Sequence, residues 1–262
     1  GPVAGAAADL LGAKKRFLAM ALWLGVLGSV TLAFLGPGEY LLASLLFALA
    51  NLGFAGGNIF YEALLPQVAR ANDLDRVSAR GYGLGYLGGG LLLVVNALWL
   101  YRPHWFWMAD RGVALRACFI SVAGWWVIFA VPLFRTVMEP RARERPRASI
   151  ALTDSVARLR QTFSEIRRYR ELALFLAAFW LYNDGIGTII KLAAAYGDEI
   201  GVDHNDMLGA LILTQFIGFP CSIGFGALAR HWGAQRTILA GLAVYAAISV
   251  AGFFIRSTWD FY

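Results

Sequence analysis

Asp184 and Lys191 are the residues whose types and spacing could bind or carry charge inside an apolar stretch of this chain. In a helix Lys191 lies within about 20° of the Asp184 face and about 10 Å further along, too far for an easy direct ion pair. We expect Asp184 to carry a coupling proton or bind a substrate amine, and Lys191 to attract a carboxylate. A structural role stays open for both, with Asp184 bonding freed backbone amides and Lys191 extending outward. Gly185 and Gly187 lie between them and favour a bend or break.

Further polar residues within apolar runs could line the same cavity. Asn51, Asn58 and Glu62 follow i, i+7, i+11 spacing, which places them on one side of a helix. Cavity lining and interhelical hydrogen bonding explain this stripe equally well. The other candidates are residues whose alternative roles are packing or interhelical hydrogen bonding: Tyr61, Tyr182, Asn183 and Gln215.

The composition indicates that lipid is the solvent around these residues. The chain has 262 residues, of which 59% are hydrophobic and only 15% charged, and the mean hydropathy is +0.59. Such a chain has too little polar surface for a soluble globule or a disordered segment. Seven stretches are long enough to cross a hydrocarbon core of about 30 Å and predict an all-α integral membrane protein: 17–36, 40–61, 81–101, 117–134, 172–190, 207–229 and 237–255.

The positions of Lys and Arg predict the orientation of these spans. Eighteen of the 23 basic residues lie before the first span or in every second connection, as seven successive crossings require. This pattern predicts a cytoplasmic N-terminal end and an external C-terminal end. The chain lacks an initiator Met and has an odd number of spans, so we expect it to be a piece of a longer protein.

Two basic segments that each precede a span repeat one another. The segments 5–15 and 226–236 share five of eleven residues, and Gly5, Gly12 and Lys15 correspond to Gly226, Gly233 and Arg236. With Asp9, the first segment resembles the signature loop between helices two and three of the major facilitator superfamily. The second resembles the degenerate loop between helices eight and nine. The sequence departs from that pattern at Leu10 and Arg230.

Three further segments, 58–66, 76–90 and 182–188, resemble one branch of that superfamily. This branch contains fungal vacuolar amino-acid exporters linked to autophagy and bacterial members of unassigned substrate. The resemblance implies helices 3 to 9 of a twelve-helix bundle, in a bacterial inner membrane. It also implies a secondary transporter that moves a small solute by alternating access. In such a carrier the signature loops act as cytoplasmic latches, and coupling to protons fits Asp184.

The connection 135–171 separates two predicted halves, 1–134 and 172–262. Its first part is rich in Pro and Arg and is typical of an extended linker. The part 150–170 has apolar residues at helical spacing opposite arginines, which predicts an amphipathic helix on anionic lipid. A nucleic-acid arm is the alternative, but we expect no nucleic-acid partner.

The remaining motifs do not predict catalysis. The run 83–88 matches a dinucleotide fingerprint, but it lies inside a span, where Gly81, Gly85 and Gly89 instead predict close helix packing. Cys118 and Cys221 lie in apolar runs, and the three histidines lie in different loops, so we expect no metal site or cofactor. The alternatives to a carrier are a receptor or scaffold on the same fold, and an intramembrane enzyme.

Overall fold

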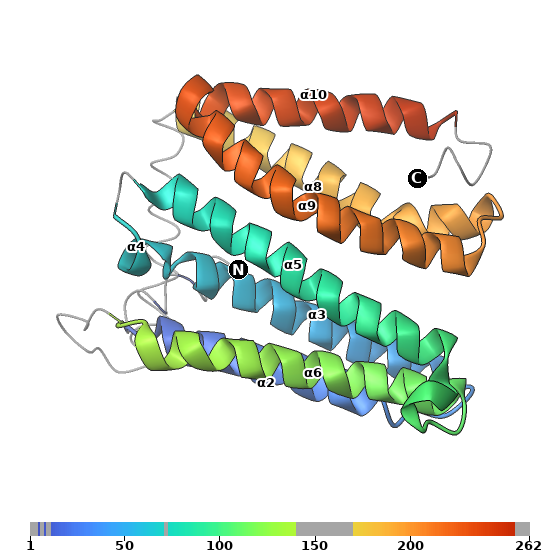
Figure 1. Cartoon of the computed structure of the whole chain (residues 1–262). Coiled ribbons are helices and arrows are strands. Elements are labelled where there is room, and N and C mark those ends of the chain that lie inside the picture. The colour runs from blue at the N-terminus through green and yellow to red at the C-terminus, as the bar shows by residue number, and fades with distance from the viewer. Residues whose placement is uncertain (1–4, 6–7, 9–11, 71–72, 140–169, 255–262) are drawn as a thin grey trace. The chain divides into compact units, whose positions relative to one another are not determined.

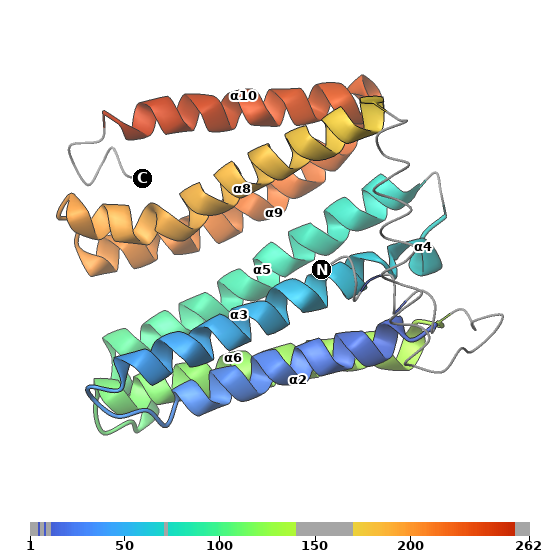
Figure 2. The same cartoon turned by 180° about the vertical axis from the view of Figure 1, so that it is seen from behind.

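The computed structural model describes residues 5, 8, 12–70, 73–139 and 170–254, and every regular element in them is helical (Figures 1 and 2). The all-α prediction is therefore confirmed. The elements are α2 (Lys14–Leu32), α3 (Tyr40–Glu62), α4 (Leu65–Val68), α5 (Leu74–Tyr101), the 3-10 helix η2 (Pro103–Phe106), α6 (Arg111–Thr136), α8 (Arg170–Glu199), α9 (His204–Trp232) and α10 (Ala234–Gly252).

Seven of these helices are long and apolar enough to cross a membrane, and each corresponds to one predicted span. Several helices continue past the apolar run into charged residues. α5 begins at Leu74 and contains Asp75, Arg76 and Arg80 before its apolar part starts. α8 has 30 residues, which corresponds to about 45 Å of helix, longer than a hydrocarbon core of about 30 Å. α8 is therefore longer than an untilted crossing requires.

The chain divides into two compact units. The first contains α2, α3, α4, η2, α6 and residues 95–101 of α5. The second contains residues Asp75–Val94 of α5 together with α8, α9 and α10.

Small residues bring α2 and α3 close together in the first unit. Gly25 and Gly28 of α2 and Gly53 and Gly57 of α3 are all buried. A Cβ atom added at Gly53 would lie 2.7 Å from the carbonyl oxygen of Ala21. Such close backbone approach is how helices associate where lipid removes the hydrophobic driving force.

Apolar side chains fill the remainder of the first unit. Leu22 and Val26 of α2 pack against Ala123 of α6, with Trp126 beside them. Leu18, Phe60 and Leu64 form a second cluster, into which Phe134 also packs. Asn96 of α5 is the buried polar side chain of this unit, and it accepts a hydrogen bond of 2.9 Å from the Ser121 hydroxyl of α6. That interhelical bond gives Asn96 a structural role between α5 and α6.

Candidate functional site

Asp184 and Lys191 lie on one unbroken helix. α8 runs from Arg170 to Glu199 without interruption, so the predicted break at Gly185 and Gly187 is wrong. No atom lies within 4 Å of a Cβ added at either glycine, apart from their own helix backbone and chain neighbours. Because the helix continues, the two charged residues keep their shared face.

The packed side of α8 lies opposite these charges. Partly buried residues recur at helical spacing along one face, and the exposed Tyr196 continues it: Tyr182, Ile186, Ile189 and Ala193. The Tyr196 hydroxyl donates a hydrogen bond of 2.9 Å to the carbonyl oxygen of Gly252, which ties this face to the end of α10. Asp184 lies about 180° around the helix from this face.

Asp184 and Lys191 are both exposed within the second unit, and neither makes a hydrogen bond or ion pair with the described part of the chain. An ionised residue facing hydrocarbon at the centre of a span costs at least about 2.5 kcal/mol. The charged face of α8 must therefore contact other protein or a water-filled cavity. Asn183 is exposed on the same helix, and Tyr182 packs edge-on against Phe179, with ring centroids 5.3 Å apart.

The polar residues of α3 also lie away from the packed side of their helix. Gly53, Gly57 and Phe60 form the buried face of α3. Asn58 lies about 140° from that face, is exposed, and makes no hydrogen bond with the described residues. The partly buried Asn51 also lacks such a bond.

Glu62 and Tyr61 are exposed at the end of the same helix. Each unit thus presents a polar helix face directed away from its own packed core.

Gln215 lies at a helix contact, apart from the charged face of α8. Its Cβ is 3.1 Å from the place where a Cβ would stand on Gly90 of α5. Gly83 of α5 meets Phe219 of α9 in the same way, at 3.4 Å. The Ser222 hydroxyl donates to the carbonyl oxygen of Ala79 at 2.8 Å. Together these contacts form a seam between α5 and α9 within the second unit.

The glycines of α5 that were predicted to pack closely are not those that contact α9 most closely. Gly85 has no neighbouring atom within 4 Å, and Gly89 lies 3.8 Å from the Gln215 amide oxygen. Gly83 and Gly90, seven residues apart, are the buried glycines of α5. The structure therefore places the closest approach at these two positions, and close packing by Gly81, Gly85 and Gly89 stays a prediction.

Each of the two repeated loops has a glycine with positive φ just before a helix. Gly12 has φ of +55° and Gly233 has φ of +82°, a region that glycine adopts without the steric cost other residues meet. Each glycine lies one or two residues before a helix, α2 or α10. The sequence repeat is thus accompanied by a positive φ at the corresponding glycine, while Asp9 lies outside the described residues.

Lysines of the first loop bind the ends of two other helices. Lys15 Nζ donates to the carbonyl oxygen of Phe134 at 2.9 Å, and its backbone N–H donates to Glu139 Oε1 at 3.2 Å. Lys14 Nζ donates to the carbonyl oxygen of Ala63 at 3.3 Å. Cations at helix C-termini are favourable because unpaired carbonyls concentrate negative charge there. Sequence reasoning missed Lys14 and Glu139, whose partners lie far away in the chain.

The corresponding residues of the second loop lie in different surroundings. Arg236 is exposed on α10. Gly226 of α9 lies so close to Ala79 of α5 that an added Cβ would overlap it. Gly5 has no atom within 4 Å of an added Cβ.

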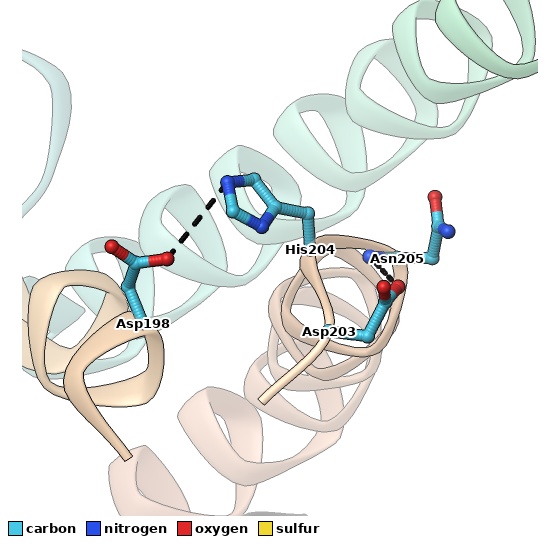
Figure 3. Close-up of polar contacts among 4 residues, drawn as sticks. All are labelled: Asp198, Asp203, His204 and Asn205. Atoms are coloured by element: carbon cyan, nitrogen blue, oxygen red, sulfur yellow. Dashed lines mark hydrogen bonds and ion pairs between the residues drawn. The ribbon is translucent and has the colours of Figure 1, made fainter. Parts of the chain in front are cut away.

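Further acidic groups lie at the end of α8 and at the start of α9 (Figure 3). His204 Nε2 lies 4.0 Å from Asp198 Oδ1, and both side chains are at least 68% exposed. The Asp203 carboxylate accepts a hydrogen bond of 2.8 Å from the Asn205 backbone and so caps α9. Exposed pairs of this kind contribute little to stability. Among the described residues, no group of three or more His, Cys, Asp or Glu is placed to hold a metal ion.

Comparisons with known proteins identify relatives of this chain. The family described as "Vacuole effluxer Atg22 like" matches residues 2–262. The chain is 34% identical to the "Uncharacterized MFS-type transporter YxiO" of Bacillus subtilis, with all of this chain and 61% of that protein aligned. It is 22% identical to Autophagy-related protein 22 of Coccidioides immitis, with 94% of this chain and 51% of that protein aligned. The chain thus spans about half to three-fifths of these relatives. No solved structure matches it.

Proposed function

This chain belongs to the Atg22-like family of vacuole effluxers, and from this premise we propose that it forms part of a secondary active transporter for a small solute. The observation that carries the proposal is the charged face of α8. Asp184 and Lys191 lie on an unbroken span, opposite its packed side. A carrier needs such groups at a water-accessible site near the middle of the membrane.

The substrate that fits this face best is a zwitterion such as an α-amino acid. Helix geometry separates the two Cα atoms by about 10 Å, and side chains lean toward the helix N-terminus, so Lys191 leans back toward Asp184. We estimate a gap of roughly 8 Å between ammonium and carboxylate. Two charge-assisted hydrogen bonds of about 2.8 Å leave roughly 2.4 Å of that gap for the substrate. That remainder matches the separation of the ammonium and carboxylate groups of an α-amino acid.

Asp184 is also the proposed carrier of a coupling proton. A carboxylate on a lipid-crossing helix can be neutralised by a proton, by a substrate amine or by Lys191. These partners compete, so proton binding and substrate binding favour different states of the site. Such differential binding is the requirement for coupled alternating access.

The two repeated loops support a carrier of two halves, 1–134 and 172–262, joined by 135–171. We propose that the halves rock about the site, with the loops around Gly12 and Gly233 as cytoplasmic latches. The bonds from Lys15 to the end of α6 and to Glu139 supply the polar contacts of the first latch. The proposed Asp9 contact and the amphipathic helix at 150–170, which would bind anionic lipid, lie outside the described residues.

The proposed location is a bacterial inner membrane, with the N-terminal end of the chain cytoplasmic and the C-terminal end outside. The relative from Bacillus subtilis supports a bacterial membrane, and the basic loops support this orientation. Residue 203 and the turn before α6 then lie outside.

Counterflow in liposomes tests the proposal with the protein expressed from its complete reading frame. We expect the wild type to exchange labelled amino acid, and Asp184→Asn to exchange it with a KM raised about tenfold and to lose proton-driven accumulation and its pH dependence. We expect Lys191→Gln to raise the KM about tenfold through loss of a carboxylate contact. Asp198→Asn, in the exposed end of α8, is the matched control and should change neither parameter more than about twofold.

Each measurement tests one part of the proposal separately. Absence of counterflow across the amino acids would contradict an amino-acid carrier and favour a scaffold. Unchanged rate and pH dependence in Asp184→Asn would remove the proton carrier.

A further inference from the structure

The turn between α5 and α6 holds an exposed aromatic cluster in a fixed arrangement. It contains Tyr101, the last residue of α5, and the 3-10 helix η2. Phe106 folds back onto Trp99 of α5, with ring centroids 6.3 Å apart at 68°. The backbone N–H of Trp105 donates a hydrogen bond of 3.1 Å to the carbonyl oxygen of Arg102. These contacts attach the turn firmly to the end of the span.

Trp107 has a backbone conformation that is usual for glycine. Its φ is +55° and its ψ is +26°, and it is the one non-glycine residue with positive φ in the described chain. The N–H of Trp107 donates to His104 O at 3.3 Å, and the N–H of Met108 donates to Pro103 O at 3.2 Å. This is the Schellman pattern, in which glycine normally occupies the left-handed position.

Contacts within the unit do not explain a tryptophan at this position. The side chain of Trp107 is 97% exposed, and that of Trp105 is 70% exposed. A bulky residue in the left-handed region carries a steric cost, and burial inside the unit does not offset it. Indole rings are enriched at membrane–water interfaces, and this turn directly follows a membrane-crossing helix.

Arg102 supplies an anion-binding group at the same place. Its guanidinium carbon lies 5.2 Å from the centroid of the Tyr101 ring and 5.6 Å from that of the Trp105 ring. Contact with ring faces orients the planar guanidinium and leaves N–H groups at its edge for a bidentate acceptor such as phosphate. No salt bridge joins Arg102 to a carboxylate in the described residues.

The charge around the turn also favours an anion. Arg111 is the first residue of α6, and Arg116 follows on that helix. The neighbouring carboxylate, Asp110, already accepts a hydrogen bond of 2.9 Å from the Val113 backbone as the cap of α6. The surface therefore combines unpaired cations with exposed indoles, a pairing that complements the phosphate and upper acyl chains of a phospholipid.

We propose that this turn is a phospholipid-binding anchor. Arg102, held by Tyr101 and Trp105, binds the phosphate of one lipid headgroup, and Trp107 lies in the interface beside the glycerol and first acyl carbons. The anchor fixes the α5–α6 hairpin at the membrane surface. This role does not depend on the transported solute, so it is tested separately from transport.

Native mass spectrometry of the full-length protein measures headgroup binding. The protein is exposed to phosphatidylglycerol, to phosphatidylcholine, or to diacylglycerol with the same acyl chains and no phosphate. We expect both phospholipids to be retained about tenfold more than diacylglycerol. Arg102→Gln should remove this preference, and Arg135→Gln, which removes an exposed charge at the far end of α6, should change it less than about twofold.

Fluorescence in nanodiscs provides a second readout that does not depend on the arginine variants. The difference in tryptophan emission between the wild type and Trp107→Phe is the contribution of Trp107. This contribution should be quenched more by lipids brominated near the headgroup than by lipids brominated near the chain ends. Equal phospholipid retention by Arg102→Gln and Arg135→Gln would overturn phosphate binding at Arg102. Displacement of the bound lipid by inorganic phosphate alone would mean that Arg102 binds free phosphate, and would overturn a lipid headgroup as the source of the bound phosphate group. A Trp107 signal that neither brominated lipid quenches would overturn the anchor.

Discussion

Gly53→Ala is expected to destabilise the protein by separating α2 from α3. A Cβ at Gly53 would lie 2.5 Å from the backbone nitrogen of Gly25, 2.7 Å from the carbonyl oxygen of Ala21, and 2.9 Å from the Cα of Gly25. All three atoms belong to backbone, so no side-chain rotation relieves the overlap. The helices must move apart, and the contacts along the α2–α3 interface weaken with them.

Gly56→Ala is the matched control on the same helix. A Cβ at Gly56 would lie 3.8 Å from the Ala21 side chain, an ordinary van der Waals distance. Replacing glycine by alanine within a helix favours the folded state by about 0.5–1 kcal/mol. Overpacking costs about 1–3 kcal/mol. The net effect is therefore a loss of about 1–2 kcal/mol for Gly53→Ala and a gain of about 0.5–1 kcal/mol for Gly56→Ala.

Thermal unfolding in detergent, followed by circular dichroism, measures both changes. In a chain of this size 1 kcal/mol corresponds to a shift in Tm of roughly 2–4 °C. The Tm of Gly53→Ala should fall, that of Gly56→Ala should rise slightly, and the two should differ by roughly 3–12 °C. Equal Tm values for the two variants would refute the proposed close approach of α2 and α3 at Gly53.

The other predictions concern single contacts. Ser121→Ala removes the interhelical bond to Asn96 and should lower stability by about 0.6–1.7 kcal/mol, measured as the unfolding midpoint in SDS. Ser249→Ala removes a hydroxyl that bonds only its own helix and should change this midpoint very little. Trp107→Gly should raise the Tm in detergent, because glycine relieves about 1 kcal/mol of left-handed strain, while it weakens quenching by interfacial bromolipids. Gly233→Ala should lower the Tm, because alanine meets about 1 kcal/mol of strain at φ of +82°, and an unchanged Tm would contradict that turn.

The spans could be predicted from sequence because lipid imposes a simple rule. A helix satisfies its own backbone hydrogen bonds, and a stretch such as 40–61 is long enough to cross the hydrocarbon. The structure places α3 at Tyr40–Glu62, nearly the same range. The start of α5 at Leu74 was missed because hydropathy reports where lipid begins, while a helix continues through Asp75 and Arg76 into water.

Tertiary partners could not be predicted, because they join distant residues. Glycine spacing on α5 indicated close packing, but the face that meets α9 is set by Gln215 and Phe219 on the other helix. The break at Gly185 was also wrong. Glycine lowers helix propensity by only about 1 kcal/mol, and the i to i−4 hydrogen bonds can still form through it. The shared face of Asp184 and Lys191 followed from spacing, but only the structure shows that this face lies opposite the packed side of α8.

Labelling of single cysteines at the two ends of α9 tests the central claim most directly. Asp203→Cys and Gln235→Cys, in a background without Cys118 and Cys221, flank this one helix. Intact cells are treated with a membrane-impermeant maleimide, and then permeabilised and treated again. The account predicts that residue 203 reacts in intact cells and that residue 235 reacts only after permeabilisation. Reaction of both residues in intact cells would contradict the membrane-crossing carrier and the proposed site on α8.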